Sequence, residues 1–182
     1  MDKLMAACLT FALSPLLFLI SLTLYFTEGK ILFIQKRPGL NGKPFEMYKF
    51  ITMTENNLPE TERITSLGRF LRKLSLDELP QILNILKGEM SFIGPRPFLM
   101  EYMPLYSAYH KRRHDVVPGI TGLAQVTGRN DLRWENKLDL DAYYVDNISF
   151  GLDIKIIILT IVYFLKGCPG SYPATKFSGY HS

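Results

Sequence analysis

Hydrophobic and polar positions divide the chain into one long apolar segment and a series of short amphipathic or alternating elements. The apolar segment, Leu4 to Thr27, contains no charged side chain. A helix of this length reaches roughly 35 Å at about 1.5 Å per residue, enough to cross a bilayer core of about 30 Å. We therefore predict a membrane helix. No small-x-small cleavage site follows it, which argues against a signal peptide.

Ser14-Pro15 lies at the midpoint of this segment and leaves two topologies open. Proline lacks an N–H and kinks a helix, and the Ser14 hydroxyl can satisfy a carbonyl that the proline frees. The residues alone therefore allow either a spanning helix or one that enters a single leaflet, breaks and returns. The basic residues that follow put the rest of the chain in the cytoplasm under either topology: Lys30, Lys36, Arg37 and Lys43.

Downstream, two apolar runs flank a loop rich in Gly and Pro, which predicts a hairpin formed by Ile31–Gln35 and Phe45–Phe50. Helical spacing predicts two amphipathic helices through Ile64–Leu74 and Leu79–Leu86, the second ending at Gly88.

The pattern beyond Gly88 alternates loops with further helices. It predicts a rigid loop at Gly94–Pro97, a polar helix at 99–114, a glycine-containing loop at Pro118–Gly128 and a helix at 132–146. Ile154–Leu165 is nearly all apolar but too short to span a bilayer. It predicts a helix that either packs in the core or lies at a membrane interface.

Composition narrows the class of protein. The chain has 182 residues, 47% of them hydrophobic, which excludes a disordered chain, and its two cysteines exclude a disulfide scaffold. The net charge of +4 resides in residues 28–182. It suits phosphates, phospholipid headgroups or nucleic acid without choosing between them.

Two short patterns are weak candidates for metal binding. His110 and His114 stand four residues apart and could share a metal on one helix face. They lie within a basic stretch that opposes a cation, so we expect a solvated or phosphate-facing surface instead. Asp139 and Asp141 resemble the acidic pair with which many nucleotide-sugar transferases hold a divalent ion.

Ser75 to Gln81 places two adjacent carboxylates before a predicted helix. One interpretation is a capping box, in which Ser75 caps the helix and Glu78 reaches back to the Ser75 N–H. The other is chemical: the helix macrodipole keeps Asp77 ionised for attack on phosphorus, and Glu78 holds Mg²⁺. The residues alone leave both interpretations open.

Longer motifs resemble the signature of the bacterial sugar transferases, which are monotopic polyprenyl-phosphate phosphoglycosyl transferases. The chain is similar to the small members, such as the enzyme that initiates bacterial N-glycan assembly. The matching motifs run in order through the chain: Arg37–Gly39, Tyr48–Met53, Leu74–Gln81, Asn84–Ser91, Gly94–Pro97 and Pro118–Arg129.

The resemblance implies an α/β fold in two parts. Residues 1–27 would form a re-entrant membrane helix broken at Ser14 and Pro15. Residues 28–182 would form a compact, mainly helical cytoplasmic domain with a small β-hairpin or sheet, interface-lying amphipathic helices and a loose tail from about residue 167. The protein would then be monotopic in the bacterial inner membrane, with its catalytic domain on the cytoplasmic face.

The resemblance also implies a ping-pong reaction in which Asp77 attacks the sugar-bearing phosphorus of a UDP-sugar, UMP leaves and undecaprenyl phosphate takes the phosphosugar. Glu78 would be the Mg²⁺ ligand. The implied substrate-binding residues are Arg96 with its neighbours Pro95 and Pro97, Arg72, Lys49, Arg129 and Asp141. The implied partners are the membrane and downstream glycosyltransferases, without nucleic acid, and a homodimer stays open.

Two departures and two rival functions qualify this interpretation. Ile51 stands where the family usually has a basic residue, and few basic residues precede the membrane segment. One rival is a non-catalytic, membrane-anchored interaction module. The other is a direct-displacement glycosyltransferase that uses Asp139 and Asp141 and releases UDP instead of UMP.

Overall fold

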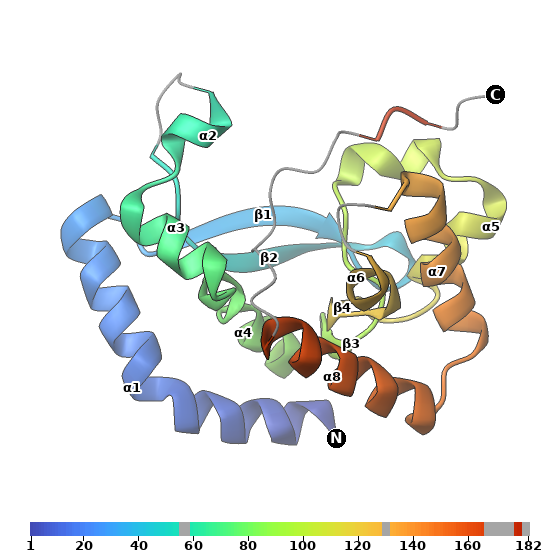
Figure 1. Ribbon diagram of the computed structural model, residues 1–182, viewed down its shortest axis with the longest axis horizontal. Helices are drawn as coiled ribbons and strands as arrows, with labels where there is room; N and C mark the ends of the chain where they lie inside the picture. The colour runs from blue at the N-terminus through green and yellow to red at the C-terminus, as the bar shows by residue number, and fades with distance from the viewer. Residues whose placement is uncertain (55–58, 129–131, 166–176, 180–182) are drawn as a thin grey trace.

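The computed structural model describes residues 1–54, 59–128, 132–165 and 177–179 (Figure 1). Arg129 and most of the tail lie outside these residues, so the predictions for them stay predictions, as does the division at residues 27 and 28. The helices are α1 (Asp2–Glu28), α2 (Glu60–Arg63), α3 (Ser66–Lys73), α4 (Gln81–Lys87), α5 (Ala108–Lys111), α6 (Leu123–Thr127), α7 (Trp134–Asp146) and α8 (Phe150–Leu165). With two small sheets, they confirm a mixed α/β fold.

The predicted hairpin is present as β1 (Leu32–Pro38) and β2 (Pro44–Phe50), which pair antiparallel. Alternate β2 side chains point to the same face, and two of them, Phe45 and Met47, are buried against α4. Lys49 is the next residue on that face. The strand alternation therefore directs the Lys49 side chain toward the segment that precedes α4.

A second sheet joins β3 (Ser91–Ile93) to β4 (Gly119–Thr121) in parallel. The pairing requires glycine, because a Cβ atom on Gly119 would lie 2.1 Å from the backbone nitrogen of Gly94. The prediction that Pro118–Gly128 is a loop is therefore wrong, since β4 and α6 both form within it. Sequence periodicity misses such short elements because tertiary contacts create them.

Helix α1 bends about midway along its length (Figure 1). Pro15 lies inside the helix, and the hydroxyl of Ser14 donates to the Phe11 carbonyl at 2.8 Å. That carbonyl is the one that the missing Pro15 N–H would otherwise bond, as the sequence predicted. Among the described residues, α1 alone is long and apolar enough to cross a membrane.

Both halves of α1 pack on the same domain. In the first half, Ala6 is buried against β2 and α4, and Asp2 accepts a 2.5 Å hydrogen bond from Ser91 of β3. In the second half, Leu24 is buried in a cluster with Phe50. Most of the helix is nevertheless exposed, so the greater part of its apolar surface has no protein cover within the described chain.

The two predicted amphipathic helices are confirmed as α3 and α4. The Thr65 side chain caps α3 by accepting the Gly68 N–H at 2.9 Å, and Gly88 ends α4 with a positive φ of 82°. The predicted helix at 132–146 is confirmed as α7. The predicted helix at 99–114 is wrong, because that segment, which contains Pro104, forms only short turns and α5.

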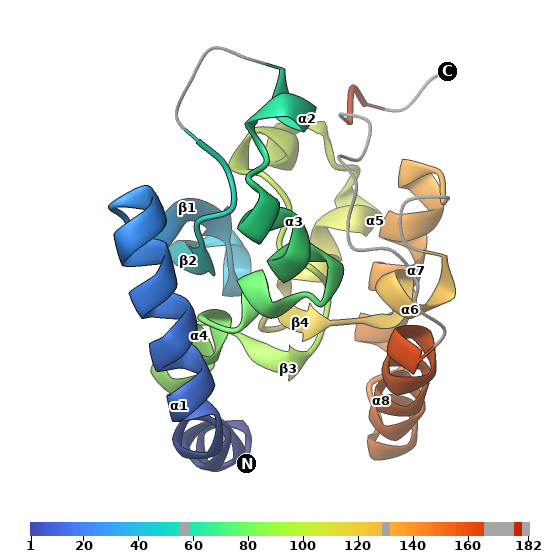
Figure 2. The same cartoon turned by 60° about the vertical axis from the view of Figure 1, so that its left-hand side comes forward.

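Helix α8 corrects the core-packing interpretation of its apolar sequence. Ile156 is the only α8 residue with a buried side chain, whereas seven large apolar side chains are exposed between residues 154 and 165: Ile154, Ile157, Ile158, Ile161, Val162, Phe164 and Leu165. Figure 2 shows α8 and the first half of α1 on the same side of the fold. This side carries much of the exposed apolar surface.

Candidate active site

The 3-10 turn η2 (Leu76–Glu78), between α3 and α4, carries both candidate carboxylates. Ser75 enters the turn with a left-handed φ of 54°, which is rare for a residue other than glycine. The capping-box interpretation is wrong. The Ser75 side chain caps nothing, and the Ser75 N–H donates to the Arg72 carbonyl instead of to Glu78.

Two cations hold Glu78. Its Oε1 accepts a hydrogen bond from Lys49 Nζ at 2.9 Å, and its Oε2 accepts one from Arg96 Nη1 at 3.1 Å. Arg96 Nη2 also donates to Oε1. The strand β2 and the loop after β3 thus meet at one side chain. Three of the predicted site residues are in direct contact.

The two neighbouring carboxyls have opposite pKa shifts. Burial raises the pKa of Glu78, but the charges and hydrogen bonds of Arg96 and Lys49 outweigh it and hold that pKa well below its usual range. Burial, and then the negative charge of Glu78, raise the pKa of Asp77. Lys49, Arg72 and Arg96 oppose this rise. Such divergence between paired carboxyls is typical of sites that divide roles between them.

Asp77 is the less constrained of the pair. It is 8% exposed, and within the described chain no hydrogen bond or ion pair engages its carboxylate. Burial is the largest influence on the pKa of Asp77 and opposes the ionisation that a helix macrodipole would favour. A buried and unpaired carboxylate beside several cations is chemically available to an incoming electrophile.

Arg72 lies near the pair as predicted. Its charge lowers the pKa of Asp77, and its Nε donates to Thr52 Oγ1 at 2.9 Å. Thr52 is buried at the end of the Tyr48–Met53 motif, and sequence reasoning gave it no role. Ile51 is partly buried against the cluster that holds the second half of α1, so it serves packing there.

The loop that carries Arg96 is held in place by buried residues on the side away from Glu78. Pro95 and Pro97 are buried, and the carbonyl of Arg96 accepts a hydrogen bond from the Arg113 guanidinium. Arg113 is itself buried and ion-paired with Asp141 at 2.8 Å. The structure therefore places Asp141 behind the loop, away from the carboxylate pair. Its contact with the site runs through Arg113.

The histidine and acidic patterns form structural pairs. Asp139 Oδ1 lies 2.8 Å from His110 Nε2, whereas Asp141 pairs with Arg113, so the two aspartates have different partners. His110, Arg113 and His114 are buried, whereas Lys111 and Arg112 are exposed, so the expected solvated basic stretch is present only in part. Within the described ranges no group of three or more His, Cys, Asp or Glu residues could hold a metal. Because Asp139 and Asp141 have different partners, the structure does not bring them together as a ligand pair.

Arg37, which sequence reasoning used for membrane orientation and as part of a family motif, lies close enough to Arg96 and Glu78 for their charges to act on it. Its Nη2 donates to Gln35 at 2.6 Å, but its Nε is buried without a hydrogen-bond partner among the described residues. Burial, and then the charge of Arg96, lower the pKa of Arg37 to about 10. The sequence signal for a role of Arg37 in the site was the Arg37–Gly39 motif, which belongs to the same set of family motifs as the segments that contain Asp77 and Arg96.

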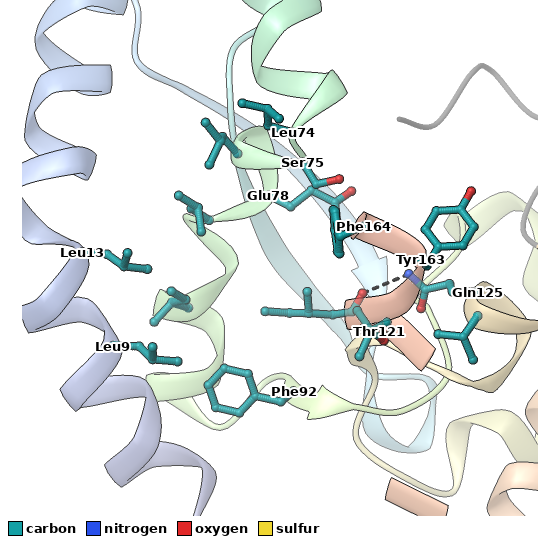
Figure 3. Close-up of a pocket in the computed structure, with 16 residues that line it drawn as sticks. Leu9, Leu13, Leu74, Ser75, Glu78, Phe92, Thr121, Gln125, Tyr163 and Phe164 are labelled. Carbon is teal, nitrogen blue, oxygen red and sulfur yellow. Dashed lines mark hydrogen bonds between the residues drawn. The ribbon is translucent and has the colours of Figure 1, made fainter. Parts of the chain in front are cut away.

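A cavity of about 310 Å³ adjoins η2 between α1 and α8 (Figure 3). Ser75 and Glu78 contribute to one wall. Leu9 and Leu13 point toward it from α1, with Phe92 near Leu9, and Thr121, Gln125 and Phe164 lie across from them in the close-up (Figure 3). Residues from β4, α6 and α8 complete the lining. The carboxylate turn thus borders a mainly apolar space.

Comparison with known proteins gives concordant matches. The family described as bacterial sugar transferase matches residues 1–167. The uncharacterized sugar transferase EpsL of Bacillus subtilis is 54% identical over 152 residues, covering 80% of this chain and 75% of EpsL. The exopolysaccharide production protein ExoY of Sinorhizobium fredii is 38% identical over 184 residues, covering 88% of this chain and 81% of ExoY.

A third relative carries a reaction in its name. The UDP-glucose:undecaprenyl-phosphate glucose-1-phosphate transferase of Klebsiella pneumoniae is 38% identical over 177 residues. The match covers 88% of this chain but only 38% of that relative. The similarity therefore involves just over a third of the longer protein.

Proposed function

The chain belongs to the bacterial sugar transferases, a family of polyprenyl-phosphate sugar-phosphate transferases, and we propose that it transfers a phosphosugar from a UDP-sugar to undecaprenyl phosphate. The products are undecaprenyl-diphosphate-sugar and UMP. The observation that carries the proposal is the buried Asp77 carboxylate, which no described side chain engages, beside Lys49, Arg72 and Arg96. This transfer is the first membrane step of glycoconjugate assembly, and glycosyltransferases downstream would consume its product.

In the first half of the reaction, a carboxylate oxygen of Asp77 attacks the sugar-bearing phosphorus of the donor. A phosphorus–oxygen bond forms, and the bond from that phosphorus to the oxygen bridging the two phosphates breaks. The electron pair leaves with UMP, and Asp77 becomes an acyl phosphate that carries the sugar. The raised pKa of Asp77 makes its ionised form more basic than an ordinary aspartate.

In the second half, an oxygen of undecaprenyl phosphate attacks the same phosphorus. The bond between phosphorus and the Asp77 oxygen breaks, which restores the free carboxylate and forms the diphosphate. One carboxylate serves both halves, so a water-soluble donor and a lipid acceptor must reach it from different directions. An active site at the membrane surface meets that requirement.

The cations have separable roles in this proposal. Arg96 offers a planar fork suited to the donor's phosphate oxygens, and Lys49 neutralises charge beside it. Arg72 is the candidate for the acceptor phosphate, and Arg129 remains a further candidate for substrate binding. Asp141 acts as a positioning residue, because its ion pair with Arg113 supports the Arg96 loop.

Mg²⁺ is part of the proposal, with Glu78 as the residue that would hold it. Mg²⁺ in phosphoryl-transfer sites is held by one or two carboxylates together with substrate phosphates. Glu78 would supply one carboxylate in exchange for one of its present hydrogen bonds to Lys49 and Arg96. When bound, the ion would neutralise charge that develops on the diphosphate. A rise in the Mg²⁺ concentration needed for half-maximal activity in Glu78→Gln, without a change in melting temperature, would support this role. An unchanged Mg²⁺ requirement would contradict it.

We also propose that α1 is re-entrant and that the catalytic domain lies on the cytoplasmic face. Support comes from the bend at the middle of α1 and from contacts at both of its ends with one domain, through Asp2 to Ser91 and through Leu24 to Phe50. A straight helix of this length spans about 40 Å and would separate its ends across the bilayer. Basic residues after α1 favour the cytoplasmic side.

Cysteine labelling tests this topology. The parent would carry serine in place of Cys8 and Cys168, and single cysteines would replace Lys3 or Thr27, which are exposed near opposite ends of α1. A re-entrant helix predicts that a membrane-impermeant thiol reagent labels both positions only from the cytoplasmic side. Labelling of position 3 from the opposite side would contradict it and indicate a spanning helix.

Product identity separates the proposal from its rivals. Purified protein would be mixed with undecaprenyl phosphate, Mg²⁺ and a panel of UDP-sugars that begins with UDP-glucose, the donor named for the Klebsiella relative. We expect UMP together with a lipid-linked diphosphate sugar. Release of UDP would favour direct displacement, and no release from any donor would favour an interaction module.

A further inference from the structure

We infer that the cavity between α1 and α8 binds the first isoprene units of the polyprenyl acceptor and delivers its phosphate to the η2 turn. This inference rests on the proposed function and adds to it the path by which the lipid reaches the reacting carboxylate. Of the described side chains that line the cavity, none is Lys or Arg. The lining therefore suits a hydrocarbon chain better than a nucleotide diphosphate.

The cavity is open to the surface of the protein. Three side chains on its wall are exposed to solvent: Leu74 at 47%, Phe164 at 45% and Leu9 at 36%. They come from the end of α3, from α8 and from α1. A ligand can therefore enter between the two exposed apolar helices without first crossing the folded interior (Figure 3).

The surroundings of the opening indicate the source of the ligand. The outer surfaces of α1 and α8 carry large exposed apolar side chains, including Phe11 at 85% and Ile161 at 53%. Exposed apolar surface of this extent on two neighbouring elements marks contact with a membrane or a partner. Because the acceptor resides in the membrane, its chain can move into the cavity laterally and keep its apolar surface out of water.

The part of the cavity wall formed by η2 explains the choice of a lipid phosphate over a bilayer acyl chain. Ser75 and Glu78 line the cavity there, and Asp77 belongs to the same turn without lining the cavity itself. Arg72, near the end of α3, acts electrostatically on Asp77. A chain seated among the apolar residues would therefore place its phosphate beside a cation and the candidate nucleophile.

A matched pair of α1 variants tests the inference. Leu9 and Leu16 lie on the same helix and are 36% and 37% exposed, but only Leu9 lines the cavity. Leu9→Trp fills the cavity from one side, and Leu16→Trp adds the same bulk elsewhere. The two half-reactions are measured separately, as the UMP burst without acceptor and as steady-state transfer to undecaprenyl phosphate.

We expect Leu9→Trp to keep the parent's UMP burst while its KM for undecaprenyl phosphate rises about tenfold or more, the effect of losing contact with about two methylene groups. Leu16→Trp should match the parent in both measurements. Equal KM values for the two variants would overturn the inference. Absence of a UMP burst in the parent would instead overturn the proposed function.

A second pair covers the case in which Leu9→Trp does not fold. Phe164→Ala removes one cavity wall on α8, whereas Ile161→Ala removes an exposed apolar side chain of the same helix that does not line the cavity. We expect a higher KM for undecaprenyl phosphate only in Phe164→Ala, with the UMP burst retained in both. A KM raised equally in both variants, or in neither, would contradict a specific binding site.

Discussion

Arg96 donates to both carboxylate oxygens of Glu78, so the loop after β3 is clamped to the turn that carries the candidate nucleophile. The contact joins residues 18 apart in sequence through a planar guanidinium. Lys49 reaches the same carboxylate from β2. Glu78 thereby fixes the positions of Lys49 and Arg96, two of the three cations that act on Asp77.

Arg96→Lys should impair activity although it keeps the positive charge. The ammonium group of lysine cannot reproduce the two-nitrogen contact that the Arg96 guanidinium makes with Glu78, nor the one proposed with the donor phosphate. We therefore expect kcat/KM to fall by about tenfold or more. Arg112→Lys is the matched control, since Arg112 makes a similar two-nitrogen contact with Asp146 on an exposed surface. Steady-state UMP release measures both variants. Equal activity of Arg96→Lys and the parent would remove Arg96 from the binding machinery.

Asp141→Asn should cost stability, because it leaves the buried Arg113 guanidinium without its counter-charge. Breaking a buried ion pair of this kind costs about 3 to 5 kcal/mol. Asp139→Asn is the control: its side chain is 58% exposed, so we expect a loss of about 1 kcal/mol or less. Denaturant unfolding of the detergent-solubilised protein compares them. Equal loss in the two variants would contradict a specific supporting role for Asp141.

His114 should make stability depend on pH in a defined range. Burial, and then the charge of Arg113, lower its pKa from 6.5 to about 4 in the folded protein. Between these values the unfolded chain holds the proton and the folded chain does not, so the free energy of unfolding falls as pH falls, by about 1.4 kcal/mol per pH unit. His114→Gln should remove this pH dependence between pH 4 and pH 6.5. Above pH 7 neither the parent nor the variant should show it.

The check is the difference in unfolding free energy between parent and His114→Gln at several pH values, because other groups titrate in the same range. A difference that stays constant from pH 4 to pH 7 would show that His114 titrates alike in the folded and unfolded chain.

Gly68→Ala should disturb the site through the backbone of Thr52. A Cβ atom on Gly68 would lie 2.2 Å from the Thr52 carbonyl oxygen, and the Thr52 hydroxyl accepts the Arg72 hydrogen bond. We expect a loss of about 1 to 3 kcal/mol in stability and a weaker affinity for the acceptor. Gly151→Ala is the control, because nothing lies within 4 Å of its added Cβ atom. Thermal unfolding that is unchanged in Gly68→Ala would contradict the close packing.

Local sequence patterns predicted the elements whose cause is local. The hairpin, α3, α4 and α7 follow from strand alternation, helical spacing and a glycine stop at Gly88. The Ser14 hydrogen bond to the Phe11 carbonyl likewise depends only on neighbours along one helix. By contrast, β4 is too short to carry a periodic signal and exists because Gly119 fits closely against Gly94.

The site itself divides in the same way. Motifs identified Asp77, Glu78, Lys49, Arg72 and Arg96 as candidates, but no pattern could show their pairing, since the Lys49–Glu78 contact joins residues 29 apart. A capping box can be predicted from sequence because its residues are only three apart. In the structure Glu78 instead pairs with Lys49 and Arg96, which are distant in sequence. The buried pair of Arg113 and Asp141, 28 residues apart, could not be predicted from a local pattern either.

The covalent intermediate on Asp77 is the central claim, and intact-protein mass spectrometry tests it most directly. The parent and Asp77→Asn would be mixed with Mg²⁺ and whichever UDP-sugar supports turnover, without acceptor, while UMP is quantified. The account predicts that the parent gains the mass of one phosphosugar, mapped to Asp77, and releases UMP in step. Asp77→Asn should retain its fold and do neither. An Asp77→Asn protein that still turns over, or a phosphosugar mapped to another residue, would contradict the mechanism.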